Sequence, residues 1–362
     1  MTKEASDLAA IRQRIDRLDE EIQARFAERA RLALQVADRK RAQGEADNFY
    51  RPEREAEVLD RAKKRNDGPL PDEAVARLFR EIMSSCLALQ KPLRVAFLGP
   101  RGTFSQEAVV KHFGHAMVTA PLNSIAEVFR EVEADAAQYG VVPVENSTEG
   151  SVNYTLDMLL RSPLRICGEV ELRVQQNLLS NEAVFADVHT VYGHQQSLAQ
   201  CREWLDANLS HAGRTPVSSN AEGARLAAHE PGSAALAGEV AAEIYGLNIL
   251  SPQVEDEPGN ATRFAVIGRQ KVASTGKDRT SLLLSLDNRP GALFGMLEPF
   301  AKHGVSMSRV ESRPSRQGNW DYVFFVDIEG HPEDENVRQA LDEVHARASL
   351  FRILGAYPRA RT

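Results

Sequence analysis

The stretch DLAAIRQRIDRLDEEIQARFAERARLALQVADRKR, residues 7–41, decides the fold of the N-terminal part of the chain. It contains neither glycine nor proline, and its apolar side chains recur at spacings of three and four, which places them on one helix face. That face contains Leu8, Ile11, Ile15, Leu18, Ile22, Phe26, Arg29, Ala33, Val36 and Lys40. At about 1.5 Å per residue the helix is about 50 Å long, more than a small domain covers by itself. We therefore expect it to pair with a second copy.

Polar side chains interrupt the apolar faces of this helical region. Arg29 and Lys40 lie on the face of the long helix, and Gln90 ends the face of a helix expected over 75–90. Each alone has a structural explanation, because cations on long helices often pair or reach solvent. Together with Glu53 on the helix between, they indicate a polar pocket. Arg12 is 17 residues before Arg29, about 25 Å along the axis, so both contact one small ligand only if Arg12 comes from another chain.

Composition narrows the function classes. The chain has 362 residues, 43% of them hydrophobic, which is enough for two or three domains. The formal net charge of -7 argues against a general nucleic-acid or anionic-membrane binder. Cys86, Cys167 and Cys201 have no CxxC spacing, so we predict no disulfide framework, no metal and no cofactor. Without a signal peptide or a membrane-spanning run, a cytoplasmic location is expected.

Beyond residue 92 the pattern changes twice. Short β-rich runs alternate with helical stretches, as expected for a mixed α/β domain over 93–271; they are LRVAFLG (93–99), YGVVPV (139–144), HTVYGH (189–194) and RFAVIG (263–268). Residues 279–362 follow the order strand, helix, strand, strand, helix, strand, which predicts a ferredoxin-like βαββαβ domain. The helical region, 1–92, makes a third domain.

Polar residues cluster near strand ends in the α/β region. Asn146 and Ser147 follow a buried-looking strand in VPVENSTEGS, Gln200 lies in GHQQSLAQC, and Thr262 and Arg263 lie in NATRF. Each could be an ordinary helix cap or edge residue. The glycine-containing FLGPRGTFSQEA matches neither the P-loop nor the dinucleotide-binding pattern.

The helical segments IRQRIDRLDEEI, FAERARLALQVADRK, FYRPEREAEVL and RLFREIMSSCLALQ resemble the all-helical chorismate mutase domain over about residues 7–91. The resemblance implies a chorismate pocket of Arg29, Lys40, Arg51, Glu53, Cys86 and Gln90, with Arg12 from the partner chain. Fixed arginines would hold the dianion in its folded conformer, and Lys40 and Gln90 would stabilise charge on the breaking ether oxygen. Phe49, Pro52 and Cys86 depart from the enteric pattern, which affects the outer contacts.

The blocks GPRGTFSQEA, VPVENSTEGS, VYGHQQSLAQC, AALAGEVAAEIYGLNIL and ATRF resemble prephenate dehydratase across residues 93–270. The resemblance implies two α/β lobes, similar to periplasmic-type binding proteins, with prephenate in the cleft between them. It makes Thr262 the hydrogen-bond or proton donor to the leaving hydroxyl and Arg263 a contact to a carboxylate. Asn146, Ser147 and Gln200 would orient the substrate.

The segment PGALFGMLEPFAKHGVSMSRVESRP resembles the ACT regulatory domain of the same enzymes. The resemblance implies phenylalanine binding by two groups of residues: Gly291, Ala292 and Leu293, then Glu311, Ser312, Arg313 and Pro314. A Pro-Gly turn that opens a helix exposes backbone N–H groups, which suit an amino-acid carboxylate. Coupling to the cleft requires different phenylalanine affinity in two states.

The order of the three resemblances implies an enzyme that converts chorismate to prephenate and prephenate to phenylpyruvate under inhibition by phenylalanine. We expect a homodimer or higher homo-oligomer without nucleic-acid or membrane partners. Two alternatives are a dehydratase that prefers arogenate and a catalytically dead amino-acid-sensing binding protein. The second predicts loss of the Thr262–Arg263 or Glu145–Asn146–Ser147 groups, and all five residues are present.

Overall fold

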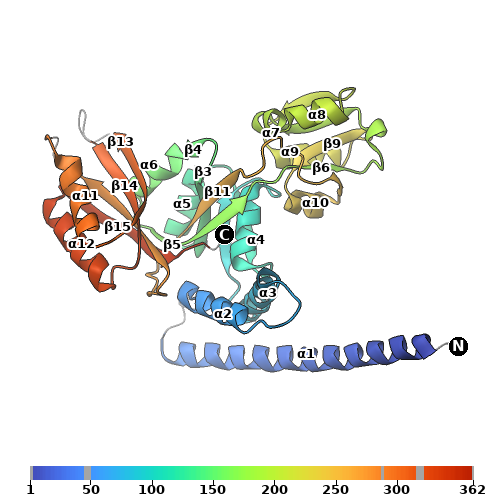
Figure 1. The fold of residues 1–362 in the computed structure, drawn as a ribbon, viewed down its shortest axis with the longest axis horizontal. Helices are drawn as coiled ribbons and strands as arrows, with labels where there is room; N and C mark the ends of the chain where they lie inside the picture. The colour runs from blue at the N-terminus through green and yellow to red at the C-terminus, as the bar shows by residue number, and fades with distance from the viewer. Residues whose placement is uncertain (1–2, 45–49, 287–288, 315–321, 361–362) are drawn as a thin grey trace. The chain divides into compact units, whose positions relative to one another are not determined.

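The computed structural model describes residues 3–44, 50–286, 289–314 and 322–360. The chain divides into two compact units, which are described separately. The first consists of Met1–Arg51, Glu57–Leu93 and Phe113–Met117, and the second of Pro52–Ala56, Arg94–His112 and Val118–Thr362. In Figure 1 the second unit contains three β-sheets with their helices.

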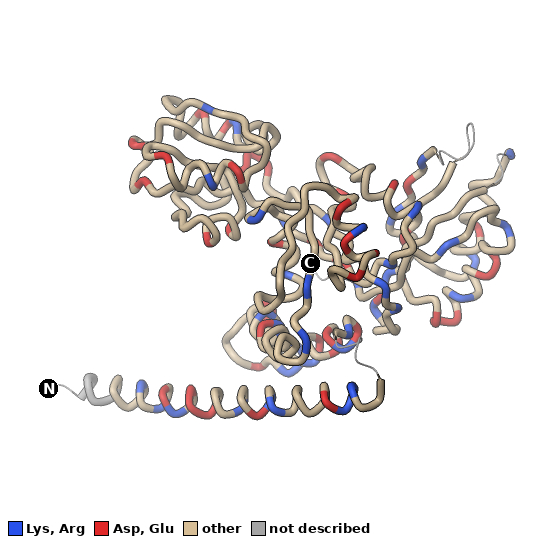
Figure 2. The backbone as a smooth tube through the Cα atoms, turned by 180° about the vertical axis from the view of Figure 1, so that it is seen from behind, with Lys and Arg blue, Asp and Glu red and all other residues tan. Residues whose placement is uncertain are grey.

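The N-terminal region is helical, as predicted. Its helices are α1 (Lys3–Ala42), α2 (Pro52–Lys64) and α3 (Asp72–Gln90). Pro52 opens α2, a position where the missing N–H costs no helical bond. The C-terminal half of α1 packs on α3, where Ala37 is fully buried, and charges of both signs are interspersed along α1 (Figure 2).

The first lobe of the α/β region is built on a six-stranded sheet in the order β2-β1-β3-β11-β5, with β4 paired to β3. β1, β2 and β3 are parallel, whereas β11 is antiparallel to both β3 and β5. The strands are β1 (Arg94–Leu98), β2 (Val118–Leu122), β3 (Tyr139–Asn146), β4 (Gly150–Ser151), β5 (Arg165–Arg173) and β11 (Ala261–Gly268). The helices are α4 (Phe104–Phe113), α5 (Ile125–Glu133) and α6 (Asn153–Arg161).

The second lobe lies between β5 and β11 in the sequence, so the chain crosses into it and returns. Its sheet has the order β10-β6-β9-β7-β8. The strands are β6 (Asn177–Ser180), β7 (Thr190–His194), β8 (Gly213–Val217), β9 (Ser233–Ala237) and β10 (Asn248–Ser251). The helices are η1 (Phe185–Asp187), α7 (Gln195–Gln200), α8 (Arg202–Asn208), α9 (Asn220–Ala227) and α10 (Glu239–Tyr245). The expected two-lobed α/β architecture is confirmed.

The C-terminal domain has the predicted βαββαβ order and an antiparallel sheet, β13-β14-β12-β15. Its elements are β12 (Asp278–Ser285), α11 (Ala292–Lys302), β13 (Met307–Pro314), β14 (Tyr322–Glu329), α12 (Glu335–Arg347) and β15 (Leu350–Pro358). Figure 1 shows both helices on one face of the sheet. Leu282 and Leu284 pack against them, whereas Leu283 faces the other way.

The other face of this sheet joins the core of the first lobe. Leu283, Phe325 and Tyr357 belong to the same buried cluster as Val142 and Ile267 of the first-lobe sheet. At Gly355 the two backbones approach so closely that a Cβ would overlap the Ile166 carbonyl. The dehydratase-like first lobe and the C-terminal domain therefore share one continuous core. In the described part of the chain no helix is long and apolar enough to cross a bilayer.

Candidate functional site

The first lobe brings Asn146 and Thr262 together. Asn146 ends β3, Thr262 is the second residue of β11, and the two are register partners in the antiparallel pair. Opposed residues share one face of a sheet. The Thr262 residue is 9% exposed, and its Oγ1 accepts a 2.9 Å hydrogen bond from Asn146 Nδ2. Two residues predicted to serve prephenate, 116 positions apart, are thus in direct contact.

The orientation of the Asn146 amide is determined by its backbone neighbours. Its Oδ1 accepts bonds from the N–H groups of Thr148 and Glu149, at 3.0 and 3.1 Å. Because those partners only donate, the oxygen must face them and Nδ2 must face Thr262. The Thr262 oxygen therefore acts as an acceptor in this bond.

Ser147 adjoins this pair, together with Asn260, a residue that the sequence analysis did not select. The Ser147 Oγ accepts from the Ala261 N–H at 2.9 Å and donates to Asn260 Oδ1 at 3.4 Å. Asn260 Oδ1 also accepts from Asn146 Nδ2 at 2.8 Å. Asn260 precedes Thr262 by two positions, so strand alternation, which places both side chains on one face, was the signal that could have found it.

The second lobe contributes α7, on which Gln200 is the last residue. The Gln200 backbone carbonyl accepts from the Asp256 N–H at 2.8 Å. Near the start of α7, Gln196 Nε2 donates to the carboxylate of Glu149, which follows the Asn146–Ser147 segment by two residues. The first turn of α7 therefore meets the Asn146 loop. The structure shows no bond between Gln200 and Thr262 among the described residues.

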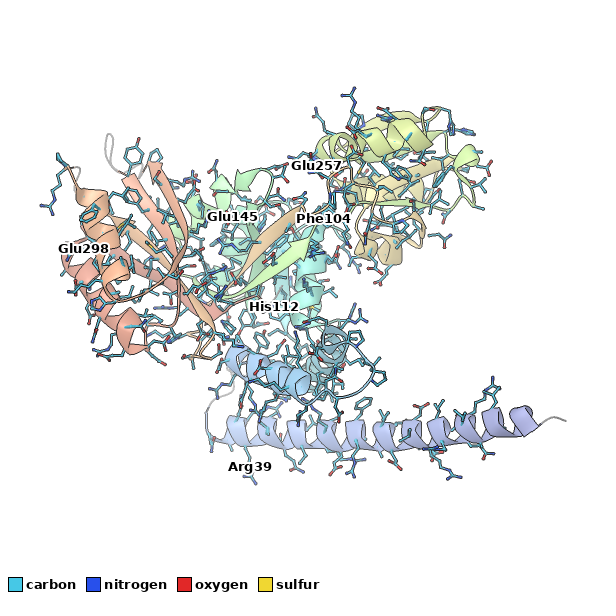
Figure 3. All side chains as sticks on the ribbon, in the orientation of Figure 1. Arg39, Phe104, His112, Glu145, Glu257 and Glu298 are labelled. Atoms are coloured by element: carbon cyan, nitrogen blue, oxygen red, sulfur yellow. The ribbon has the colours of Figure 1, made fainter. Side chains whose placement is uncertain are left out.

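Arg263 lies on the opposite face of β11 from Thr262. Its guanidinium donates to Asp327 Oδ2 of β14 at 2.7 Å and to Glu145 Oε2 of β3 at 3.2 Å, and it lies 3.6 Å from Glu169 Oε2 of β5. Glu145 is labelled in Figure 3. Successive side chains of a strand point to opposite faces, so Arg263 and Thr262 do not face the same side of β11, and the contact of Arg263 with a prephenate carboxylate stays a prediction.

Charge balance keeps Arg263 ionised in this network. Burial by itself would lower the pKa of the guanidinium, but the nearby carboxylates of Asp327 and Glu169 raise the pKa above its ordinary value. Asp327 also accepts from Ser281 Oγ at 2.6 Å. The Arg263 side chain therefore joins the first-lobe sheet to the C-terminal sheet.

In the first unit, the packing of α1 on α3 brings two of the predicted chorismate residues, Arg29 and Cys86, into contact. Arg29 Nη1 donates to Cys86 Sγ at 3.0 Å, and the Gln90 carbonyl accepts from Arg41 Nη2 at 2.9 Å. Lys40 is half-buried in the last turn of α1. Cys86 is buried and unpaired with any other cysteine.

The other predicted mutase residues belong to the N-terminal half of α1 and to the start of α2. Arg12 is exposed on the N-terminal half of α1, about 25 Å along the helix from Arg29. Arg51 is the exposed N-cap residue of α2, and Glu53 is half-buried in its first turn. Phe49 lies outside the described residues.

The two predicted effector segments occupy different places in the C-terminal domain. Gly291, with φ +81°, is the N-cap residue of α11 and is followed by Ala292 and by Leu293, which is 45% exposed. On β13, Ser312 and Pro314 are exposed, and Ser312 pairs with Phe324, which packs on the helix-covered face. These residues therefore lie on the side of the sheet that carries α11.

Glu311 and Arg313 alternate to the other side and contact the first lobe. Glu311 Oε2 accepts from Ser151 Oγ at 2.8 Å. Arg313 donates to Asn153 Oδ1 at 2.8 Å and lies 2.9 Å from Asp157 Oδ1. The segment they hold, β4 and the start of α6, continues directly from Asn146 and Ser147.

These features define a multidomain enzyme with a helical domain and a two-lobed α/β domain joined to a βαββαβ domain. Sequence models of three families match the chain: chorismate mutase type II over residues 11–91, prephenate dehydratase over 95–272 and the ACT domain over 280–346. The chain belongs to the bifunctional chorismate mutase/prephenate dehydratase family and carries both enzyme domains. This confirms the family, fold class and enzyme class predicted from the sequence.

Relatives of this family match almost the whole chain. The bifunctional chorismate mutase/prephenate dehydratase of Stutzerimonas stutzeri is 53% identical over 361 residues, which is 99% of each chain. The protein of the same description from Pseudomonas aeruginosa is 52% identical over 98% of each chain. The solved prephenate dehydratase of Arthrobacter aurescens in complex with L-Phe is 34% identical, with a TM-score of 0.68, over 74% of this chain and 90% of that chain.

Proposed function

We propose that the chain converts chorismate to prephenate in its helical domain and prephenate to phenylpyruvate in its two-lobed domain, under inhibition by L-phenylalanine. The observation that carries the dehydratase assignment is the contact between Thr262 and Asn146 beside the loop that meets α7. Family membership supports both activities. We also propose a cytoplasmic location, because both substrates are intermediates of amino-acid biosynthesis.

The mutase pocket holds chorismate by its two carboxylates. The rearrangement is pericyclic and requires no general base, so the protein contributes orientation and charge stabilisation. Arg29 binds one carboxylate, and Lys40 and Gln90 stabilise the negative charge that grows on the ether oxygen as its C–O bond breaks. Arg51, Glu53 and Cys86 complete the pocket in this proposal.

A second copy of the chain supplies Arg12 to this pocket. The stripe Leu8, Ile11, Ile15, Leu18, Ile22 and Phe26 is exposed within one chain, with Leu18 at 55%. Because these side chains are already about half covered, burying the rest against a partner helix is favourable by about 1 kcal/mol for each large side chain. The homodimer formed in this way places Arg12 from one chain near Arg29 of the other, which a single straight helix does not allow.

In the dehydratase reaction, the ring of prephenate becomes aromatic. The C–C bond to the ring carboxylate breaks and releases carbon dioxide, its electron pair enters the ring, and the hydroxyl leaves with a proton as water. We assign the donation of that proton, or of a hydrogen bond, to Thr262. Gln200 orients the substrate, and Asn146 and Ser147 orient it through the Thr262 hydroxyl and the loop that they hold.

L-Phenylalanine binds at the C-terminal domain in this proposal. In the exposed turn at Gly291–Leu293 the Ala292 N–H already donates to the Arg289 carbonyl at 3.1 Å, so we assign the carboxylate of the amino acid to the Leu293 N–H beside it. Ser312 and Pro314 lie on the same side of the sheet, whereas Glu311 and Arg313 hold the first lobe. A change at β13 on effector binding therefore acts directly on the segment that follows Asn146.

The test is phenylpyruvate formation from chorismate as sole substrate, with and without phenylalanine. We expect product from the wild type and less product with phenylalanine. Lys40→Ala should abolish mutase turnover but convert supplied prephenate, and Thr262→Val should accumulate prephenate from chorismate. Loss of both activities in either variant would contradict the assignment of the residues to separate sites. If the enzyme turns over arogenate faster than prephenate, arogenate is the preferred substrate of the dehydratase domain.

A further inference from the structure

We propose that Asn260 is a positioning residue of the dehydratase reaction, which acts through the Asn146 amide to leave the Thr262 hydroxyl proton free for the substrate. The inference rests on the proposed roles of Asn146 and Thr262. It starts from four side chains that hydrogen bonds link: Asn146 at the end of β3, Ser147 just after β3, Asn260 just before β11 and Thr262 on β11.

Every bond around Asn260 has a defined direction. The Ser147 Oγ accepts from the Ala261 N–H and donates its own proton to Asn260 Oδ1. Asn146 Nδ2 can only donate, so Asn260 Oδ1 accepts from it as well. The Asn260 oxygen therefore receives two donors, and the Asn260 amide cannot be turned around without placing NH₂ against NH₂.

The same reasoning extends to Asn146. Its oxygen receives the N–H groups of Thr148 and Glu149, so both of its N–H bonds point away from that loop. One goes to Asn260 and the other to Thr262 Oγ1. Asn260 thus accepts the Asn146 N–H that does not bind Thr262, and this second bond fixes the plane of the Asn146 amide.

The consequence appears at Thr262. In the described residues its hydroxyl accepts the bond from Asn146 and donates none within the protein. A hydroxyl that accepts a bond is a better donor, because bonds in a chain polarise one another. An unperturbed threonine is a weak acid and needs help to donate its proton. In this proposal the network supplies that help, because it holds the Thr262 O–H in place, polarises it and directs it at the leaving hydroxyl.

The backbone anchors Asn260 at the required place. Its carbonyl accepts from the Val174 N–H at 2.8 Å, immediately after β5, and the Ser147 N–H donates to the Ala261 carbonyl at 2.8 Å. The residue is therefore held between the strands that flank β11. This explains how a side chain that contacts no reacting atom in the proposal controls the geometry of one that does.

The experiment measures steady-state dehydration of supplied prephenate by the full-length enzyme. Asn260→Ala should lower kcat roughly tenfold, the effect of one lost orienting hydrogen bond. Asn260→Asp keeps an oxygen that can accept the bonds from Asn146 and Ser147, so its kcat should stay close to that of the wild type. Its KM should rise, because the added negative charge repels the prephenate dianion. Asn208→Ala, at an exposed asparagine on α8, is the matched control and should change neither constant.

A double-mutant cycle distinguishes positioning from a structural role. If Asn260 acts through Asn146, Asn260→Ala should cause no further loss of kcat in the Asn146→Ala background. Independent, multiplying losses would overturn the proposal, as would full kcat in Asn260→Ala or a reduced kcat in Asn260→Asp. Thr262→Val separates a failure of the proposed active site from a failure of the inference about Asn260. Full turnover in Thr262→Val would contradict the assignment of Thr262 as the donor. If Thr262→Val is inactive and Asn260→Ala is fully active, only the positioning role of Asn260 is contradicted.

Discussion

Two neighbouring residues of β11, Thr262 and Arg263, have separate environments because strand side chains alternate between faces. Thr262 meets Asn146 on one face, and Arg263 meets Asp327 and Glu145 on the other. The motif NATRF predicts that both residues contact the substrate, and the sheet places their side chains on opposite faces. Arg263 links β11 to the C-terminal domain.

A prediction at this scale concerns Glu107 of α4. Burial, followed by the charges of Glu239 and Glu243 on α10, raises the pKa of this carboxyl from 4.5 to about 7, although Lys111 on α4 opposes the shift. Because the folded state binds the proton more tightly than the unfolded state, the free energy of unfolding falls as pH rises from about 4.5 to 7. Glu107→Gln should therefore be more stable than the wild type at pH 8, by about 1–3 kcal/mol, and similar to it at pH 5.

Denaturant unfolding at both pH values measures this difference. Glu203→Gln removes an exposed carboxylate of α8 and serves as the control, with the same stability relative to the wild type at pH 5 and pH 8. An advantage of Glu107→Gln that is equal at the two pH values would contradict a titration of Glu107 in this range.

At the scale of elements, α1 illustrates how one helix serves two surfaces. Its C-terminal half packs on α3 and carries Arg29 and Lys40, whereas the apolar stripe of its N-terminal half is exposed within the single chain. The sequence periodicity predicts the helix and the stripe together. It also predicts the second copy, because one straight helix cannot bring Arg12 and Arg29 to one ligand.

Leu18→Glu tests this function of α1. A charge in the middle of the stripe should weaken self-association and lower mutase turnover, because the partner subunit's Arg12 would no longer reach the pocket. Dehydration of supplied prephenate should continue. Gln13→Glu introduces the same charge on the opposite, exposed face of α1 and should change neither property. Analytical ultracentrifugation alongside chorismate turnover provides the measurement, and a monomer with full mutase activity would contradict the shared pocket.

At the scale of the whole molecule, the dehydratase lobe and the C-terminal domain are connected by a shared core and by charged contacts. β13 holds the β4–α6 segment through Glu311 and Arg313, and β14 holds β11 through Asp327. An effector can shift a two-state equilibrium only by its difference in affinity for the two states. The contacts of β13 and β14 with the first lobe can produce this difference in affinity if they differ between the two states.

Asp157→Asn weakens one of these contacts, the pair with Arg313, without altering a residue assigned to substrate or effector. We expect basal dehydration close to that of the wild type and a severalfold higher phenylalanine concentration for half-maximal inhibition. Inhibition curves for the full-length enzyme measure the shift. Glu335→Gln breaks an exposed pair with Arg338 within α12 and should leave the curve in place. An unchanged curve for Asp157→Asn would remove this ion pair from the coupling.

The elements and the family of this protein can be predicted from its sequence. Spacings of three and four specify the helix of residues 7–41, β-rich runs specify the strands, and ordered motifs such as VPVENSTEGS and NATRF specify the enzyme class, because such patterns depend only on neighbours along the chain. Only the tertiary structure decided which face each motif residue occupies. Register between β3 and β11 places Asn260 with Asn146 and sends Arg263 toward Asp327, because pairing of distant strands sets which side chains meet.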